Sequence, residues 1–581
     1  MTHGRDRGPR WLWAAALLVL GCKAPAPEAT VPEPTAAADE TAKAKPDYGA
    51  LEFPELLTEM RDPESCVGAL IEVADRFGQA TDSERSALVA EAVPAMLKLW
   101  DDFPELRLPI LRLFETVGDP GAAPIWNRAL TVDEIPSPLE EFDVAARSVA
   151  QTRATASLPT VHAAMAWFLE HPTADRVQQP GAQRLALIEA MIALRDRSSV
   201  PVLLEVLKQP VETQPVAVHR RATDALGLIR DPAAVQGLIL VPYSIPDVPT
   251  TTSVTERSKM ALASIGEPAV EPLLGALRGE NKDLNELLRR HGIQAPLGSM
   301  AAVMTLGAIG SPSAATGLIE AMPDDDCGSR RTQSAPDEDD DSWKAQSRAW
   351  YANALGLIGD ERAVDPLCRC AKTSREPGEL YPITEALSRI GGSEASSCLA
   401  RVIRRGRYHP DTVVGPEFEL EIRWEAARHA LLAVEPGQLA QIEAAIKSAN
   451  RSKDVAKHTA QWDSGIAVLR RCGTDLPCYS SVLADPEQPW FAREVAAMNA
   501  ARLAPGDADV ALQIARAYAV EDPDARVTMA WLTGHMLDDT RCQACADTLQ
   551  HVLDEAKREG LPPKYQLSVL TARTAIAKLR E

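Results

Sequence analysis

The stretch YANALGLIGDERAVDPLCRCAK, Tyr351–Lys372, decides the fold of this chain. Its apolar residues recur at helical spacing up to Ile358, which predicts a first helix with one apolar face. Gly359 then stands where the chain leaves that helix, a position that favours a left-handed residue. Asp360 follows as a residue that can accept a hydrogen bond from an unpaired N–H of the next helix. The stretch therefore predicts a helix, a tight corner and a second helix.

The same pattern recurs along the chain and predicts a repeat architecture. Several copies place proline directly after the capping residue, and another proline follows a few residues later, as at Pro366. We therefore expect each second helix to begin with a distorted or 3₁₀ turn. The intervals between copies run from 32 to 49 residues, apart from one of 77 that spans about two periods. Such periods indicate helical hairpins that bury their apolar faces by stacking. The last apolar residue of each first helix is Val117, Leu194, Ile229, Ile265, Ile309, Ile358, Ile390 or Val434.

The segments ALGLIGDERAVDPL, from Ala354, and ALASIGEPAVEPLL, from Ala261, resemble the HEAT repeat in its short bacterial form, the PBS-lyase HEAT-like repeat. The resemblance is clear over about residues 106–447 and weaker toward the C-terminus. It implies an all-α fold, an α-solenoid of stacked helical hairpins of the HEAT/armadillo-like kind. Because this family consists mostly of scaffolds, the resemblance says much about fold and little about function.

Composition divides the chain into five parts. Residues 1–21 are predicted to be a lipoprotein signal peptide, and residues 22–48 a lipidated cysteine with a disordered tether rich in Pro, Ala and Glu. Residues 49–105 are expected to form an N-terminal helical cap. Residues 106–447 contain the HEAT-like repeats, interrupted by an acidic loop at 323–342, and residues 448–581 degenerate helical repeats with a C-terminal cap.

The N-terminus has the pattern of a targeting segment. Basic residues precede the apolar run 11–20, which is too short to span a bilayer. The run ends in VLGC at 19–22 and resembles the lipobox of bacterial lipoproteins, in which the cysteine, here Cys22, carries the lipid after cleavage. Lys23 follows, which in that family favours the outer membrane over the inner one. We therefore expect a lipid-anchored protein of the bacterial envelope, on its periplasmic or surface face, with an ordinary secretory signal as the alternative.

The charge of the chain limits its partners. A net charge of −21 argues against nucleic acid, whose phosphates require a basic surface. It also argues against attraction to anionic lipid headgroups, so membrane contact is expected through the N-terminal lipid. The sequence contains no phosphate-binding glycine loop, nucleophile elbow or zinc-ligand spacing, and we predict no catalytic residue, metal or cofactor.

Ten cysteines in an exported chain favour disulfides. Cys472 and Cys478 flank a repeat corner that can bring their Cα atoms within the roughly 4.4–6.8 Å that a disulfide needs. Cys542 and Cys545 form a C-x-x-C for which a structural disulfide is favoured over a redox dithiol, and Ala546 replaces the histidine of a haem site. The pairing of five others is left open: Cys66, Cys327, Cys368, Cys370 and Cys398.

Two charged segments are candidate interaction sites. Asp337, Asp339 and Asp341 have the spacing of the first EF-hand ligands, but Ser342 and Arg348 replace the glycine and glutamate, so a solvated acidic loop is expected. Such a loop can reach a basic cluster, and we expect a salt-sensitive contact that affects partner access and not folding. The cluster stands at the end of a second helix, where cations suit the helix dipole: Arg401, Arg404, Arg405 and Arg407.

The leading functional hypothesis is a membrane-anchored, non-enzymatic scaffold. Its concave surface, expected to be lined by second helices, would bind a protein or peptide partner in the envelope. The family name implies one alternative, an enzyme related to bilin lyases, and a purely structural envelope component is another. A defined stoichiometric partner favours the scaffold, whereas a bound chromophore or metal favours the enzyme.

Overall fold

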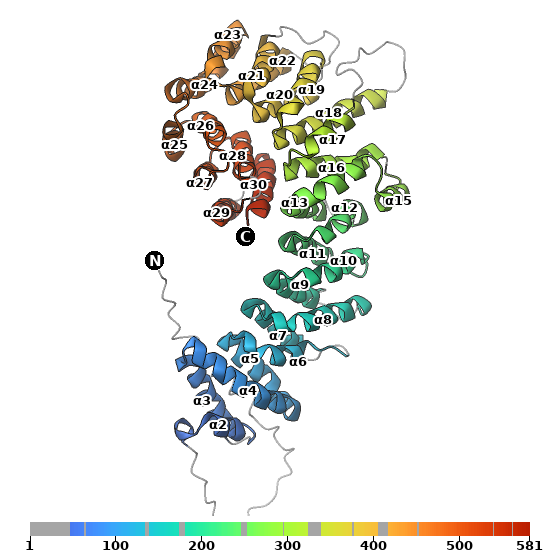
Figure 1. Ribbon diagram of the computed structural model, residues 1–581, viewed down its shortest axis with the longest axis vertical. Coiled ribbons are helices and arrows are strands. Elements are labelled where there is room, and N and C mark those ends of the chain that lie inside the picture. Colours follow the sequence, from blue (N-terminus) through green and yellow to red (C-terminus); the bar gives the residue numbers. More distant parts are fainter. Residues whose placement is uncertain are drawn as a thin grey trace, which may run out of the picture. The chain divides into compact units, whose positions relative to one another are not determined.

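The computed structural model describes residues 47–62, 65–133, 139–172, 181–245, 253–293, 295–323, 338–374, 377–404, 416–449, 453–537, 540–559 and 562–580. Over these ranges the chain is helical and has no strand, and neighbouring helices pack as stacked hairpins (Figure 1). The predicted fold class, an all-α solenoid, is confirmed. The chain divides into two compact units, Met1–Ala225 and Leu226–Glu581.

The first unit contains the helices up to α11, whose last turn belongs to the second unit. An edge-on aromatic cluster joins its N-terminal helices to the repeats. The ring centroid of Phe77 lies 6.0 Å from that of Phe53 and 6.1 Å from that of Phe114. Such contacts add roughly 0.5–1.5 kcal/mol beyond the burial of the rings. The helices are α2 (Phe53–Glu59), α3 (Cys66–Gln79), α4 (Asp82–Asp102), α5 (Arg107–Val117), α6 (Ala123–Leu130), α7 (Leu139–Thr152), α8 (Leu158–Glu170), α9 (Ala182–Leu194), α10 (Val200–Lys208) and α11 (Val216–Ile229).

The second unit continues the helical hairpins to the C-terminus. Its helices are α12 (Val235–Ser244), α13 (Val254–Ile265), α14 (Val270–Leu277), α15 (Lys282–Arg290), α16 (Ala295–Ile309), α17 (Ala314–Ala321), α18 (Glu338–Ile358), α19 (Val364–Thr373), α20 (Pro377–Ile390), α21 (Gly392–Arg404), α22 (Pro416–Ala433), α23 (Leu439–Ala449), α24 (Lys453–Cys472), α25 (Leu476–Ala484), α26 (Trp490–Leu503), α27 (Ala508–Ala517), α28 (Pro523–His535), α29 (Gln543–Glu559) and α30 (Gln566–Leu579). Short 3₁₀ helices occur in both units: η1 (Tyr48–Ala50), η2 (Pro104–Leu106), η3 (Pro120–Ala122), η4 (Thr155–Ser157), η5 (Arg197–Ser199), η6 (Pro232–Ala234), η7 (Glu267–Ala269), η8 (Glu361–Ala363), η9 (Pro436–Gln438) and η10 (Pro563–Tyr565).

The predicted corner lies between α18 and α19. Gly359 has a left-handed φ of 76°, and the carboxylate of Asp360 accepts a hydrogen bond from the backbone N–H of Arg362 at 2.9 Å. The 3₁₀ helix η8 then leads into α19, as expected from the sequence. The corner is a repeated device, because the same bond to the N–H two residues on is made by Asp119, Asp196 and Asp231.

In the second unit the first helices of the repeats form the inner layer. A Cβ added to Gly356 of α18 would lie 2.5 Å from the Cα of Ala386 in α20. A Cβ added to Gly307 of α16 would lie 2.8 Å from the Cα of Ala354 in α18. Because these glycines lack side chains, successive first helices approach closely. The expectation that second helices line the concave surface is therefore wrong for this unit.

This inner layer closes on itself. In order, α13, α16, α18, α20, α22, α24, α26, α28 and α30 pack against one another, and α30 then packs against α13 (Figure 1). At this closure the guanidinium of Arg230 donates to the hydroxyl of Ser264 at 2.8 Å and to the carbonyl of Ala577 at 3.1 Å. We call this set of inner helices the ring. The C-terminal repeats thus fold back onto the repeats that precede them.

The acidic loop predicted at 323–342 ends earlier than expected. Helix α18 already begins at Glu338, so residues 338–342 belong to a helix, and residues 324–337 lie outside the described ranges.

We expect Gly356→Ala to destabilise the second unit by about 1–3 kcal/mol, because the new methyl group overpacks the contact between α18 and α20. The matched control is Gly378→Ala in α20, where an added Cβ meets nothing within 4 Å. That change should be neutral or stabilise by up to about 1 kcal/mol. Urea unfolding followed by tryptophan fluorescence measures both. Equal stabilities for the two variants would contradict the close approach.

Candidate functional site

A pocket of about 140 Å³ lies inside the second unit, between α13, α16 and α18 on one side and α28 and α30 on the other. Leu567 lines this pocket and is 59% exposed, whereas Ile576 and Leu579 further along α30 are buried. We call this cavity between α13, α16, α18, α28 and α30 the ring pocket. Its larger apolar lining residues are Met304, Trp350, Leu357, Trp531, Leu567 and Leu570, and its polar ones are Glu256, Lys259, Asn353, His535, Thr571, Thr574 and Lys578.

Side chains of the C-terminal repeats hold the ring together by capping the ends of its first helices. The last carbonyls of an α-helix have no partner within the helix. Trp531 Nε1 donates to the carbonyl of Leu357 at 3.0 Å, and Lys578 Nζ donates to that of Ile309 at 2.9 Å. Arg502 donates to Ser388 at 3.0 Å in the same manner. Cationic donors also suit the negative end of the helix dipole, so these contacts stabilise the closed ring.

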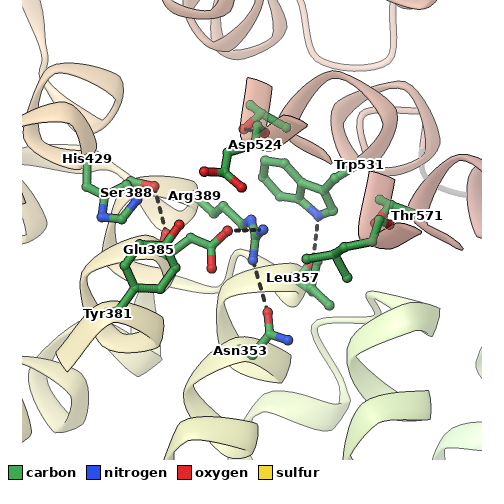
Figure 2. Close-up of polar contacts among 12 residues, drawn as sticks. Asn353, Leu357, Tyr381, Glu385, Ser388, Arg389, His429, Asp524, Trp531 and Thr571 are labelled. Carbon is green, nitrogen blue, oxygen red and sulfur yellow. Dashed lines mark hydrogen bonds and ion pairs between the residues drawn. The ribbon is translucent and has the colours of Figure 1, made fainter. Parts of the chain in front are cut away.

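Arg389 of α20 connects the ring pocket to the charged interior beside it (Figure 2). Its guanidinium donates to Asn353 Oδ1 at 3.1 Å and to Glu385 Oε1 at 2.6 Å. The same guanidinium stacks over the indole of Trp531, with its central carbon 5.6 Å from the indole centroid. A cation over an indole face is attracted by its quadrupole. Arg389 therefore fixes two pocket residues, Asn353 and Trp531, from opposite sides of the ring.

Arg428 of α22 is the centre of a second, larger charge cluster. Its guanidinium, almost fully buried, forms two hydrogen bonds to the buried carboxylate of Glu494 in α26, at 2.8 and 2.9 Å. It also contacts Asp524 at 3.3 Å, Asp522 at 3.4 Å and Glu425 at 3.8 Å. One cation thus faces four carboxylates from three inner helices and the N-cap of α28, and it joins the C-terminal repeats to α22.

The excess of carboxylates changes the protonation of this cluster. The pKa of Glu425 is raised to about 7, mainly by burial; Arg428 opposes this rise, and the negative charges of Asp524, Glu494 and Asp522 add to it. Burial likewise raises the pKa of Glu494 above its ordinary value. The cluster therefore favours a protonated Glu425 at neutral pH and below.

We expect the thermal stability of the chain to decrease as the pH rises from about 6 to about 8. The pKa of Glu425 is raised from 4.5 to about 7 in the folded state, so its stabilisation is present below 4.5 and is lost as the pH rises through about 7. The pKa of Glu141 in the first unit, raised to about 7 by burial, acts in the same direction. Glu425→Gln should therefore flatten the curve of melting temperature against pH only in part. Parallel curves for wild type and variant would contradict this assignment.

His535 in the lining of the ring pocket is neutral at physiological pH. The pKa of its imidazole is lowered to about 4, mainly by burial and additionally by the nearby charge of Lys578. The imidazole stacks on Trp531 with the ring centroids 5.0 Å apart. Around neutral pH, the charged residues lining the pocket are therefore Glu256, Lys259 and Lys578.

The structure brings together both cysteine pairs that the sequence suggested. The Cα atoms of Cys472, at the end of α24, and Cys478, in α25, lie 5.4 Å apart, and their sulfurs are at bonding distance. Cys542 and Cys545, at the start of α29, have their Cα atoms 5.2 Å apart and are joined in the same way. None of these four cysteines lines the ring pocket. Both pairs therefore act as cross-links between residues close together in the sequence, as expected for structural disulfides.

A further cysteine pair, which the sequence left open, links two consecutive second helices. Cys368 of α19 and Cys398 of α21 have Cα atoms 5.9 Å apart and bonded sulfurs. Cys66 and Cys370 each take part in a disulfide as well, and no cysteine in the described ranges is a free thiol. Cys22 and Cys327 lie outside the described residues.

We expect non-reducing peptide mapping of the native, unreduced protein to link Cys472 to Cys478 and Cys368 to Cys398. The longer of these two loops restricts the unfolded chain more, although a loop of this size contributes only about 3–4 kcal/mol. Recovery of either pair as alkylated free thiols in unreduced protein would contradict its disulfide. Reduced protein, mapped in parallel, serves as the control.

The acidic segment and the basic cluster, which the sequence suggested as interaction sites, lie only partly within the described ranges. Arg401 and Arg404 lie in the last turn of α21, where Arg404 donates to the carbonyl of Gln441 at 3.5 Å. Asp339 and Asp341 lie in the first turns of α18. Arg405, Arg407 and Asp337 lie outside the described ranges, so the suggested contact between the two segments stays a prediction.

Arg348, which replaces the EF-hand glutamate, has a structural partner. It donates to Glu379 Oε1 at 2.6 Å, and both side chains are buried between α18 and α20. The hydroxyl of Ser374 donates to the same carboxylate at 2.7 Å. The attraction within a buried ion pair that has additional hydrogen bonds can offset the free energy needed to remove both charges from water. Arg348 therefore has a structural role, in the contact between α18 and α20.

The model of the PBS lyase HEAT-like repeat matches residues 347–373. The match spans the end of α18, its corner and α19, the stretch that predicted the fold. No curated protein shows a significant match to the chain. The fold and the matched repeat together define a helical-repeat protein with a HEAT-like repeat.

Two further observations concern membranes and metals. Within the described residues, no helix is both long and apolar enough to cross a bilayer. Over the same part of the chain, no group of three or more His, Cys, Asp or Glu residues is placed to hold a metal ion.

Proposed function

We propose that this protein is a membrane-anchored, non-enzymatic HEAT-like scaffold that binds a protein or peptide partner in the bacterial envelope. HEAT-like repeats suggest a scaffold, since their function depends on surfaces built by stacking and not on a conserved reaction centre. The N-terminal lipobox pattern supports the anchor, and the cysteine pairs suit an oxidising compartment.

The observation that carries the proposal is the ring pocket with Leu567 at its edge. A concave, mainly apolar pocket with a few polar groups is the usual form of a binding site. An exposed apolar residue alone has no such meaning, but one beside an apolar pocket marks a contact surface. We therefore place the partner at the rim of the ring pocket.

Affinity capture with the full-length chain from detergent-solubilised envelope tests the proposal. Wild type should retain one partner at a defined stoichiometry, and Leu567→Asp should lose it. Leu503→Asp is the matched control, because Leu503 is also an exposed leucine, 41% accessible, on α26 and outside the pocket. A partner retained equally by both variants, or no stoichiometric partner at all, would overturn the proposed function.

The anchor is tested separately, by mass spectrometry of the mature N-terminal peptide. We expect it to begin at Cys22 and to carry lipid. An unmodified or uncleaved peptide would overturn the anchor and leave the partner-binding proposal standing.

A second candidate function follows from the name of the matched repeat, that of PBS lyases, and is an enzyme related to bilin lyases. It predicts a chromophore that co-purifies with the chain and absorbs visible light. A colourless protein that retains a stoichiometric partner would favour the scaffold over this enzyme.

A further inference from the structure

The two helices that meet where the ring closes are basic in an otherwise acidic protein. The chain has 61 basic and 82 acidic residues and a net charge of −21. Helix α30, QLSVLTARTAIAKL, contains Arg573 and Lys578 and no acidic residue. Helix α13, VTERSKMALASI, contains Arg257 and Lys259 beside a single acid, Glu256. The two helices that form this seam, α13 and α30, therefore together carry a net positive charge, opposite to that of the molecule as a whole.

The ring pocket opens onto this seam. Lys259 of α13 and Lys578 of α30 both line it, and Lys259 forms an ion pair with Glu256. His535 adds no charge at neutral pH, since its imidazole has a pKa of about 4. The pocket lining thus has two cations and one anion, and an approaching negative charge is favoured there.

The size of the pocket limits what can enter it. At about 140 Å³, it resembles the apolar cavities of roughly 150 Å³ that accommodate a benzene-sized group. Its apolar walls include Trp350, Trp531 and Leu570. One large apolar or aromatic side chain matches this volume and these walls, whereas a folded domain edge or a large cofactor does not.

We infer that the partner contributes an acidic peptide segment, which lies along the seam of α13 and α30 and inserts one large apolar or aromatic side chain into the ring pocket. This inference rests on the proposed function and adds the chemistry of the partner. The apolar side chain provides the anchor, and carboxylates on either side of it meet Lys259 and Lys578. Positive partners are disfavoured, because they would face these two ammonium groups in the pocket lining.

Fluorescence anisotropy with three labelled peptides tests the inference on the full-length chain. The probes are an acidic peptide with a central tryptophan, Glu-Asp-Trp-Asp-Glu, the same peptide with alanine at its centre, and Lys-Lys-Trp-Lys-Lys. The acidic tryptophan peptide should bind saturably. The other two should bind at least about tenfold more weakly, and raising the salt from about 50 to about 300 mM should weaken the first peptide several-fold.

Three variants locate the binding. Thr571→Trp fills the pocket from α30 and should abolish binding, whereas Thr548→Trp on α29 is its control. Both hydroxyls make the same bond to the carbonyl four residues earlier, and Thr548 is outside the pocket. Glu256→Gln removes the one anion of the pocket lining and should strengthen binding of the acidic peptide several-fold, a gain that a misfolded variant cannot give.

Several results would overturn the inference. These are no saturable binding by wild type, equal binding of the tryptophan and alanine peptides, equal binding of the lysine peptide, or weaker binding after Glu256→Gln. If affinity capture still depends on Leu567 while the acidic peptide fails, the proposed function stands and only the acidic chemistry is wrong. If the peptide binds as expected but no envelope partner is captured, the proposed function fails and the peptide site remains.

Discussion

Replacing Arg428 by leucine should destabilise the second unit by about 3–5 kcal/mol, because it leaves the buried carboxylate of Glu494 without its cation. Glu494 is fully buried and receives two hydrogen bonds from this guanidinium. Asp522 and Asp524 at the start of α28 face the same group. Urea unfolding, followed by tryptophan fluorescence, should show a transition at clearly lower denaturant.

Two comparisons separate the role of burial from that of charge. Arg470→Ala removes an ion pair in which Arg470 lies 2.8 Å from Glu443 and the arginine side chain is 63% exposed. This change should lower the free energy of unfolding by no more than about 1 kcal/mol. The double variant Arg428→Leu with Glu494→Leu should recover part of the loss, since it removes a buried anion together with its partner. Similar effects of Arg428→Leu and Arg470→Ala would contradict the buried cluster.

Trp531→Ala should cost about 3–5 kcal/mol, the usual range for removing a buried tryptophan. The indole is 8% exposed, stacks on His535, lies beneath Arg389 and donates to the carbonyl of Leu357. Its loss empties the contact between α28 and the repeats of α18 and α20. Thermal and urea unfolding of the full-length chain measure the effect.

Trp531→Phe tests which part of the indole matters. Phenylalanine keeps most of the apolar surface but cannot donate to Leu357, and an unpaired buried carbonyl costs about 1–3 kcal/mol. Leu503→Ala, on the exposed part of α26, should change stability by no more than about 0.5 kcal/mol. If Trp531→Ala behaved like Leu503→Ala, the contact between α28 and α18 would be contradicted.

The repeat itself could be predicted from sequence, because its signals are local. Apolar spacing, a glycine with positive φ and an aspartate that caps two residues on all lie within about 15 residues, and Gly359 and Asp360 behave as expected. The cysteine pairs Cys472–Cys478 and Cys542–Cys545 are equally local. Local geometry alone brings such groups together.

The apolar spacing alone does not tell which of the two helices of a hairpin faces the inside of the ring. The sequence pattern of Ala354 and Leu355 is the same for an inner and an outer helix. Gly356, one residue further on, carries the missing signal, because a glycine within an apolar helix marks close approach of a neighbour. Its copies at Gly227 and Gly307 meet Ala261 and Ala354 in the same way. Recurrence of this glycine could have identified the inner layer.

Closure of the ring, and therefore the candidate site, could not be predicted in this way. Trp531 meets Leu357 across 174 residues, and Arg230 meets Ala577 across 347. Single tryptophans and arginines on apolar helices have no local pattern that indicates a distant partner. Their roles depend on how the small curvature of each hairpin adds up over the unit, which no single repeat encodes.

Photo-cross-linking from position 567 tests the central claim, closure of the ring around its pocket, most directly. p-Benzoylphenylalanine replaces Leu567 in the full-length chain, and the cross-linked peptides are mapped by mass spectrometry after irradiation. We expect cross-links from α30 to the pocket residues of α16 and α18, above all near Met304 and Trp350. The same group at Leu503 should give none to these helices. Cross-links from position 567 that stay within α28–α30 would show that α30 does not close onto α16 and α18.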